Sequence, residues 1–590
     1  MTRVTEVKKL GLGSAIAAVL IVGVLLAWWS VQAADRRMRE DLLRHTRLVA
    51  QAIDVRRVKA LSGTETDLAL PEYQRFKQQL IATLTVFPRC RFLYLMGRRP
   101  DGKVFFYADS EPAGSADESP AGQIYEEISP YYLRVFDTGV EGAVGPVTDR
   151  WGTWVTSLIP LTDPDTGDLL AVLGMDIDAR DWQWETVRAG FFPLLVTVVL
   201  VALLLAGNAV LAWRGRLGGR YGNGLRHAEA VLAGIIGLTL TLAAALADDQ
   251  AKDRSHVERF SPLVSSQTSR VAAVFEALGD IELEGLARFI SSSRQVNKQE
   301  FGAFTEYLVR KNTIQAWEWI PVVPAEEKDF FEQERRQEGL PDYRIWQKDA
   351  AGKPAPAAGR QFYYPVLYVA PLAGNESVLG FDLGSEPVRR SALEEAARSR
   401  LPTCTDPISL VQETDGQQGL LVYRPVYPDK ETGSPQGFAL AVLHLGTFLQ
   451  NAVGPSLGKP AIYLDLYQLR AGEPALLLAS TSAAKNKTPL TAPLPVVRPL
   501  FVFGKTFAVV VRPGPAFTAL HPAGHGWMTV LAGLVMTGAI ALVIGFITHR
   551  REELELLVQE RTTALVESGF SSPARSWPYT ILSARQCAGR

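Results

Sequence analysis

Four long apolar runs constrain the fold of this sequence more than any other feature. Each run is close to the roughly 20 residues that cross a bilayer as an α-helix. Tryptophans stand at several of the run ends, where amphipathic rings favour the membrane interface. The sequence therefore predicts four transmembrane helices. The runs occupy residues 11–29, 191–213, 228–247 and 527–548.

Two of these runs allow another interpretation or are weaker than the rest. The first could be a signal peptide, but its apolar core is longer than the roughly 7–15 residues typical of such peptides. No clear small-residue cleavage site follows it beyond the phrase "VQAA", which favours an uncleaved anchor. The third run is the weakest of the four, because Glu229 shortens it.

Basic residues flank the runs on one side only, if every run spans the membrane. Lys8 and Lys9 precede the first run, arginines fill the short loop after the second, and Arg550 and Arg551 follow the fourth. The positive-inside rule makes these flanks cytoplasmic and leaves two long segments outside. The predicted divisions are a cytoplasmic N-terminus (1–10), transmembrane helices (11–33, 189–213, 228–247 and 526–548), a cytoplasmic loop (214–227), two extracytoplasmic domains (34–188 and 248–525), a helix start (549–567) and an irregular tail (568–590).

Charge and cysteine content exclude some classes of function. The net charge of −1 gives no basic field of the kind that binds nucleic acid. The three cysteines, Cys90, Cys404 and Cys587, fall in different segments, so no disulfide within a domain is expected. No CxxC or His/Cys cluster predicts a metal site. We therefore expect neither a metal nor a cofactor.

The first outer segment predicts an α+β domain. Apolar residues recur at helical spacing over residues 42–53, and two pairs of apolar runs then flank turns rich in Asp, Pro and Gly, the first pair at 92–96 and 104–107. The phrases "GKVFFYADSE" and "GMDID" resemble the Cache/PAS-like sensor domains of bacterial receptors. The polar or aromatic residues chosen as candidate ligand contacts are Tyr125, Trp154 and Asp176.

The second outer segment begins with a long amphipathic pattern over residues 257–289, which predicts a stalk helix. Strand and helix patterns alternate afterwards. The stretches "RQFYYPVLYVAP" and "SVLGFDL" each predict a strand, and "PVRRSALEEAARS" predicts a helix with Pro387 near its first turn. The phrases "IQAWEWIPVV", "RQFYYPVLYVAP", "GNESVLGFDLGSEPVRRSALEEAARSR", "TDPISLVQE" and "GLLVYRPVY" follow in order. This run resembles the CHASE domain, the extracellular sensor of membrane-bound histidine kinases, cyclases and plant cytokinin receptors. The resemblance implies two PAS-like lobes behind a long helix, a small-molecule ligand and a place in a bacterial inner membrane.

The resemblance also implies particular ligand contacts. A threonine in the family's "T-x-P" phrase touches the ligand, and Thr405 stands at that position. Pro371 and Leu372 replace the acidic residue that reads cytokinin, which argues against that ligand.

Four further residues in this segment are candidate contacts, each with a structural alternative. Asp382 could bind a ligand or cap the following helix start, and Arg360 could pair an anion or lie at the surface. Trp317 and Trp319 share one strand face, as the floor of a pocket or as packed core.

The helix start at 549–567 carries about two heptads, and its phrase "VQERTTAL" resembles the signalling helix that drives receptor output domains. A charged stop-transfer flank is the alternative. The tail at 568–590 has no kinase or cyclase phrase, which suggests a truncated or frameshifted sensor, acting as a homodimer or in mixed dimers with a full-length sensor. The alternative function is a histidine kinase or diguanylate cyclase by ancestry, catalytic only in a longer form. No catalytic residue is predicted. A transporter is disfavoured, because no span carries a charge in its middle.

Overall fold

The structure is a computed structural model that describes residues 2–216, 227–293, 296–310, 314–410, 418–428, 433–453, 460–482, 496–520 and 527–570. The predicted tail, most of the predicted cytoplasmic loop and Cys587 lie outside these residues. The chain divides into two compact units. One contains Met1–Trp29, Gly190–Lys252 and Gly524–Arg590, and the other contains Ser30–Ala189 and Asp253–Ala523.

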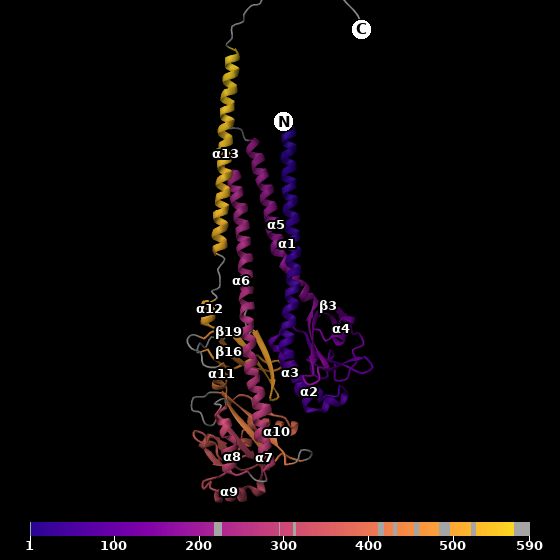
Figure 1. Cartoon of the computed structure of the whole chain (residues 1–590), viewed down its shortest axis with the longest axis vertical. Helices are drawn as coiled ribbons and strands as arrows, with labels where there is room; N and C mark the ends of the chain where they lie inside the picture. The colour runs from indigo at the N-terminus through magenta and orange to yellow at the C-terminus, as the bar shows by residue number, and fades with distance from the viewer. Residues whose placement is uncertain are drawn as a thin grey trace, which may run out of the picture. The chain divides into compact units, whose positions relative to one another are not determined.

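The first unit is built from apolar parts of four long helices. These are α1 (Thr2–Ala50), α5 (Ala179–Arg216), α6 (Ala228–Ala277) and α13 (Trp527–Phe570) (Figure 1). Each contains a stretch long and apolar enough to cross a membrane, and the stretches are Gly11–Ala50, Ala179–Trp213, Ala228–Asp249 and Trp527–Ala564. The helices extend beyond the apolar runs. The predicted boundary at residue 33, for example, falls inside α1, because the helix continues into polar sequence whose apolar face is buried elsewhere.

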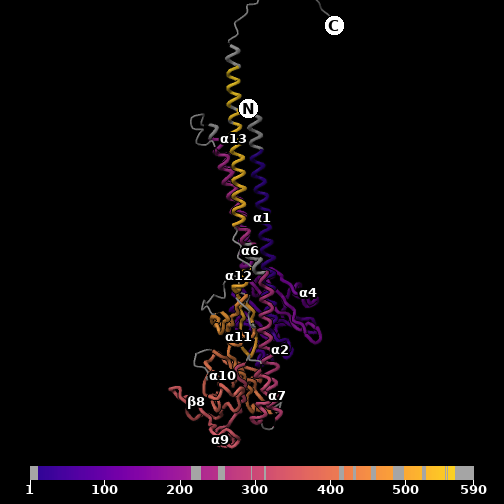
Figure 2. Tube along the Cα trace, turned by 60° about the vertical axis from the view of Figure 1, so that its left-hand side comes forward, coloured from indigo at the N-terminus to yellow at the C-terminus, as the bar shows by residue number. Residues whose placement is uncertain are grey.

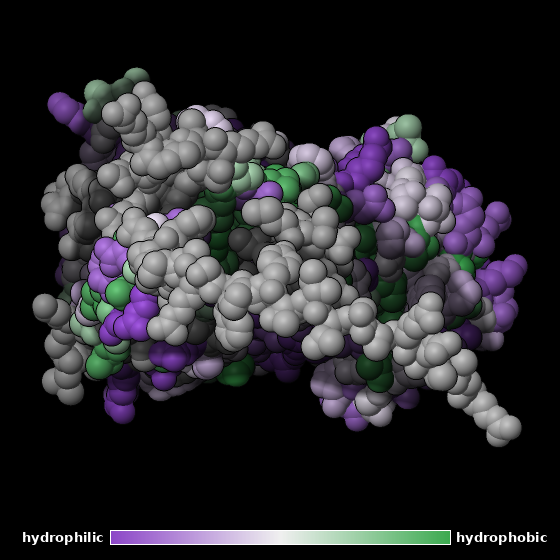
Figure 3. All heavy atoms as spheres, turned by 90° about the horizontal axis from the view of Figure 1, so that it is seen from above, coloured by the Kyte–Doolittle hydropathy of each residue, from purple (hydrophilic) through white to green (hydrophobic). Residues whose placement is uncertain are grey.

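Small residues bring these four helices close together, as is common for helices in lipid. A Cβ on Gly23 would collide with Thr197, and one on Gly237 would collide with Thr537. Figures 1 and 2 both show α6 and α13 side by side. In the end-on view of Figure 3, hydrophilic side chains are prominent at the margins of the visible face, and hydrophobic ones show between them.

The first α+β domain, within Ser30–Ala189, has a five-stranded antiparallel sheet in the order β2-β1-β5-β4-β3. Both predicted hairpins are present as β1/β2 and β4/β5. One sheet face packs on α1 and α3, and the other carries an aromatic core under α4. The elements are α2 (Val55–Lys59), η1 (Glu65–Ala69), α3 (Pro71–Thr83), η2 (Leu84–Val86), β1 (Phe92–Arg98), β2 (Val104–Asp109), α4 (Pro130–Thr138), β3 (Gly142–Asp149), β4 (Gly152–Thr162) and β5 (Leu169–Asp178).

The second α+β domain, within Asp253–Ala523, begins on the predicted long helix. After α6 the helix passes through a π-helical segment, Leu278–Leu283, into α7 (Glu284–Ser292). Helix α8 (Lys298–Val309) starts with a capping box between Asn297 and Glu300, in which each side chain accepts from the other's backbone N–H.

Among the described residues, the two largest sheets of this domain share one core with α6, α7 and α8. The larger has the order β11-β6-β15-β14-β12, with β13 paired to β14, and the smaller has the order β17-β16-β19-β18. The other face of the larger sheet packs on α10. The elements are β6 (Ala316–Pro321), β7 (Val323–Pro324), η6 (Ala325–Glu327), α9 (Lys328–Gln337), β8 (Trp346–Lys348), β9 (Pro354–Pro356), β10 (Phe362–Tyr363), β11 (Tyr368–Ala370), η7 (Glu376–Val378), η8 (Leu383–Ser385), α10 (Pro387–Ser399), β12 (Thr403–Cys404), β13 (Ile408–Ser409), β14 (Gln418–Val426), β15 (Gly437–His444), α11 (Leu445–Val453), β16 (Ile462–Leu469), β17 (Leu476–Ser480), β18 (Val496–Val502), β19 (Lys505–Pro513) and α12 (Pro515–Leu520).

Two strand predictions in this domain are wrong. The phrase "RQFYYPVLYVAP" forms two short strands, β10 and β11, rather than one, and Pro365 between them has no N–H for a ladder. The phrase "SVLGFDL" forms two 3-10 turns, η7 and η8, instead of a strand. Tertiary contacts override strand propensity there, because the backbone of this loop bonds to two separate segments of the domain, one at Trp346 and one at 364–366.

Candidate functional site

The aromatic face of the first domain contains a small pocket that brings together the three residues chosen there from sequence. Tyr125, Trp154 and Asp176 all line a cavity of about 20 Å³. The sheet register explains part of this meeting: Asp176 on β5 lies opposite Phe92 on β1 and Thr156 on β4. Since side chains of directly paired residues point to the same face, this row faces the pocket.

Asp176 is a buried carboxyl, only 4% exposed. Its Oδ1 accepts hydrogen bonds from the Thr156 hydroxyl at 2.6 Å and from the Tyr94 hydroxyl at 3.1 Å. Oδ2 accepts no hydrogen bond among the residues that the structure describes. Burial raises the pKa of Asp176 to about 7, and the negative charge of Asp149 acts in the same direction, while the two hydrogen bonds oppose it.

The second carboxylate of the pocket, Asp149 at the end of β3, holds the aromatic side chains in place. It accepts hydrogen bonds from the Tyr125 hydroxyl at 2.8 Å and from Trp154 Nε1 at 3.0 Å. Trp151, on the turn between β3 and β4, lies with its ring centroid 5.9 Å from Tyr125 and 6.0 Å from Phe106. The result is a ring of aromatic faces around the two carboxyls.

The charges around this pocket are unbalanced. Two more aspartates line it, but Asp109 is paired with Lys77 at 2.6 Å and Asp117 with Arg91 at 2.8 Å. Neither Asp149 nor Asp176 has an ion-pair partner among the described residues. The lining contains no lysine or arginine. The pocket is therefore acidic as well as aromatic.

The candidates in the second domain make internal contacts. Asp382 is fully buried, caps η8 through the N–H of Gly384, and pairs with Arg360 at 2.8 Å. Asp382 therefore caps a helix start, as in the structural alternative, and Arg360 forms an ion pair with the same carboxylate. The Thr405 hydroxyl accepts a hydrogen bond from the Leu421 N–H at 3.1 Å, next to the pairing of β12 with β14.

Trp317 and Trp319 do share one strand face, but that face is the core against the long helix. Both side chains are buried there. The packed-core alternative therefore describes their surroundings. Trp317 Nε1 has no hydrogen-bond partner within the described part of the chain.

Sequence reasoning missed a polar group on the opposite face of the same strand. Glu318 lies between the two tryptophans, points toward α10 and is 2% exposed. Leu440 pairs with both Glu318 and Tyr423, so the two polar side chains lie in one row across the sheet. Burial raises the pKa of Glu318 to about 8, opposed by the nearby charge of Arg389 on α10. The Tyr423 hydroxyl is unpartnered among the described residues. A charged residue between two tryptophans in a strand was the available signal.

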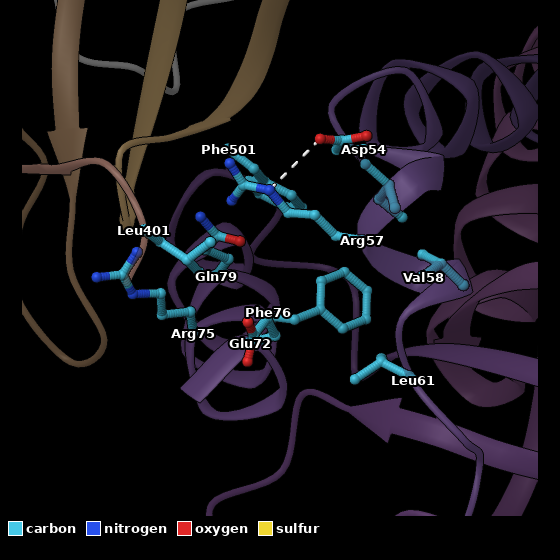
Figure 4. Close-up of a pocket in the computed structure, with 11 residues that line it drawn as sticks. Asp54, Arg57, Val58, Leu61, Glu72, Arg75, Phe76, Gln79, Leu401 and Phe501 are labelled. Carbon is cyan, nitrogen blue, oxygen red and sulfur yellow. Dashed lines mark ion pairs between the residues drawn. The ribbon is translucent and has the colours of Figure 1, made fainter. Parts of the chain in front are cut away.

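A third group of residues joins the two α+β domains. Arg75 on α3 is 7% exposed and reaches into the second domain, where it donates to Thr403 Oγ1 at 2.6 Å, Ser399 Oγ at 2.7 Å and Glu395 Oε1 at 3.2 Å. Burial lowers its pKa to about 10. Figure 4 shows Arg75 directed toward the ribbons of the second domain, with Leu401 and Phe501 lining the same crevice.

Nothing in the described ranges groups three or more His, Cys, Asp or Glu side chains as a metal site. Cys90 and Cys404 are free thiols, and burial raises the pKa of Cys404 to about 12. The thiols are therefore protonated and poor nucleophiles at neutral pH.

Comparison with known proteins gives one family match and several distant structural similarities. No curated protein matches the chain. The solved structures include an extracellular ligand-binding receptor from Desulfohalobium retbaense DSM5692, with TM-score 0.26 and 12% identity, covering 43% of this chain and 40% of that one. Another is the ligand-binding domain of the Pseudomonas aeruginosa PAO1 amino acid chemoreceptor PctC in complex with GABA, with TM-score 0.23 and 17% identity, covering 42% and 98%. TM-scores of this size carry no argument about function.

The family match falls in the second domain. Its limits enclose Glu318, Asp382 and Thr405, together with the whole of the larger sheet. The expected resemblance is confirmed: residues 294–478 match the family model of the CHASE domain.

Proposed function

We propose that this chain is the input part of a membrane receptor that senses small molecules on the extracytoplasmic side of a bacterial inner membrane. The observation that carries the proposal is the CHASE match at 294–478 in a chain whose described residues include four membrane-length helices. The CHASE domain is the extracellular sensor of the receptors that the sequence resembles, which supports a sensing role for the second α+β domain. The resemblance of the first domain to Cache/PAS-like sensors supports the same role there. The partners we propose are a small-molecule ligand, the lipid bilayer and a second receptor chain.

The buried polar groups of the second domain support a binding role. The Tyr423 hydroxyl has no hydrogen-bond partner among the described residues, and it lies on the same sheet face as the buried Glu318 carboxyl. Unsatisfied buried polar groups cost roughly 1–3 kcal/mol each, so such groups need an explanation beyond stability. A ligand that bonds to them would recover part of that cost.

The test is a thermal-shift screen of the full chain, in detergent or nanodiscs, against a metabolite library. A ligand that binds the folded state raises the melting temperature by mass action. The two variants Glu318→Gln and Asp176→Asn assign each hit, because loss of the shift in only one of them identifies the domain. A library in which no compound shifts the melting temperature would count against the receptor proposal.

A further inference from the structure

We infer that the first α+β domain binds a small organic cation, an amine or a methylated ammonium, between Asp176, Asp149 and the surrounding aromatic rings. The inference rests on the proposed receptor function and names the ligand class of one of its two domains. It is built from the aromatic faces, the charge balance and the free carboxylate oxygen of the pocket.

Aromatic rings are prominent in the lining of the pocket. The lining includes six aromatic side chains, which are Phe92, Tyr94, Phe106, Tyr125, Trp151 and Trp154. The faces of such rings attract cations, and cages of them recognise alkylammonium groups. Tyrosines and tryptophans could equally enclose an apolar ligand, so the rings alone do not choose between a cation and a neutral molecule.

The two carboxyls of the pocket favour a cation over a neutral molecule. Asp176 and Asp149 have no cationic partner among the described residues, while their neighbours Asp109 and Asp117 do. A buried carboxylate without a counter-charge is costly, and an ammonium group would supply the missing charge. The same two groups would repel an anionic ligand. Oδ2 of Asp176 is the acceptor left for the ammonium N–H, since both observed hydrogen bonds end on Oδ1.

The small volume of the pocket limits which groups can enter it. A cavity of about 20 Å³ holds about one water molecule, so an alkylammonium group enters only when part of the lining moves. Trp151 is the part best placed to move, because it lies on a turn, whereas the other five rings lie on strands or against the sheet. The guanidinium of its neighbour Arg150 lies over the Trp151 ring, 4.1 Å from the ring centroid.

The experiment is isothermal titration of the full chain with matched probes. Butylamine and choline carry the cation, butanol and 3,3-dimethylbutanol are their neutral counterparts, and butyrate is the anion. We expect at least one cation to bind and its neutral counterpart and butyrate to bind at least about tenfold more weakly. Asp176→Asn should weaken cation binding at least about tenfold. Asp101→Asn, at an exposed turn of the same domain, should leave it unchanged.

Trp151→Leu provides a second variant that does not alter the buried carboxyl, and it should also weaken binding of the cation. Equal binding of a cation and its neutral counterpart, no cation binding at millimolar concentration, or full binding by both variants would overturn the inference. If other metabolites still stabilise the chain in that case, the receptor proposal stands while the cation site falls.

Discussion

At the scale of single residues, burial decides what each candidate side chain does. Asp382 and Thr405 are buried, and their side-chain oxygens accept hydrogen bonds from backbone N–H groups and from Arg360. They therefore stabilise the fold directly. Asp176 and Glu318 are just as buried, yet each keeps polar capacity unused and each has a raised pKa. The carboxyls differ in how many hydrogen-bond donors surround them in the fold. The position of a residue in the sequence does not show that number.

Asp176 should make stability depend on pH. Its folded pKa of about 7 lies above its unfolded value near 3.9, so the folded state binds the extra proton between those values. The stability it contributes is full below pH 4 and is lost as the pH rises through 7, by at most about 4 kcal/mol. The asparagine in the Asp176→Asn variant cannot titrate. The melting temperature of the variant, relative to that of the wild type, should therefore rise between pH 5 and pH 8.

Other titratable groups face Asp176, but they remain in both proteins and cancel in this comparison. Tyr94, Tyr132 and Asp149 interact with the Asp176 carboxyl, and so does the Cys90 thiol. Parallel pH profiles for the wild type and the variant would show that Asp176 is ionised in the folded state at neutral pH.

At the scale of elements, the register of the first sheet builds the pocket. Tyr94 on β1 lies opposite Gly174 on β5, two residues before Asp176. The missing side chain at Gly174 lets the Tyr94 ring lie across β5 and donate to Asp176, because a Cβ there would be only 2.3 Å from Tyr94 Cε2. One glycine therefore positions a hydrogen-bond donor on a neighbouring strand.

Gly174→Ala should displace the Tyr94 ring and destabilise the protein by about 1–3 kcal/mol, the usual cost of overpacking a core. Chemical denaturation of the full chain measures the change. Gly142→Ala, in β3, is the matched control, because a Cβ there meets no atom within 4 Å. A similar loss in both variants would place the cost in strand backbone preference rather than in the Tyr94 contact.

At the scale of the whole molecule, a buried arginine helps to link the two α+β domains. Arg75 donates to Thr403, which pairs with Tyr423 in the row that continues through Leu440 to Glu318. Phe501 of the second domain also packs in the core of the first. A shift in either sheet therefore has a direct physical route to the other domain.

Arg75→Leu should destabilise the chain by about 2–3 kcal/mol, because it leaves buried acceptors without a donor. We also expect a single calorimetric unfolding transition of the two domains to broaden or split. Arg57→Ala is the control within the same crevice, since Arg57 is more exposed and, within the described part of the chain, pairs only with Asp54 (Figure 4). Its removal should cost less than about 1 kcal/mol. Equal effects of the two variants would mean that Arg75 does not join the domains energetically.

The proposed topology predicts which side of the membrane each segment occupies. In a background with native cysteines replaced by serine, Asp101→Cys and Ala351→Cys should react with an impermeant maleimide in spheroplasts, because both positions are exposed. Arg551→Cys should react only after permeabilisation. Labelling of Arg551→Cys in intact spheroplasts, or protection of the other two positions, would contradict the proposed orientation.

The sequence by itself determined the features that depend on near neighbours in the chain. The four apolar helices, the hairpin of β1 and β2, and α10 starting at Pro387 follow from local periodicity, turn residues and capping preferences. Tyr125, Trp154 and Asp176 are separate candidates in the sequence. The register of β4 and β5 places Trp154 and Asp176 on one sheet face, and the connection between β2 and α4 adds Tyr125 to the same pocket.

Only the tertiary structure decided the contacts between distant segments. Arg75 and Thr403 are 328 positions apart, and no local pattern marks either as a partner of the other. Glu318 reads as a polar residue between two buried tryptophans, but its surroundings depend on α10, which arrives about 70 positions later in the chain. Burial and charge balance arise from the sum of all neighbours in space, so the unused carboxyl oxygens that carry our inferences appear only once the chain is folded.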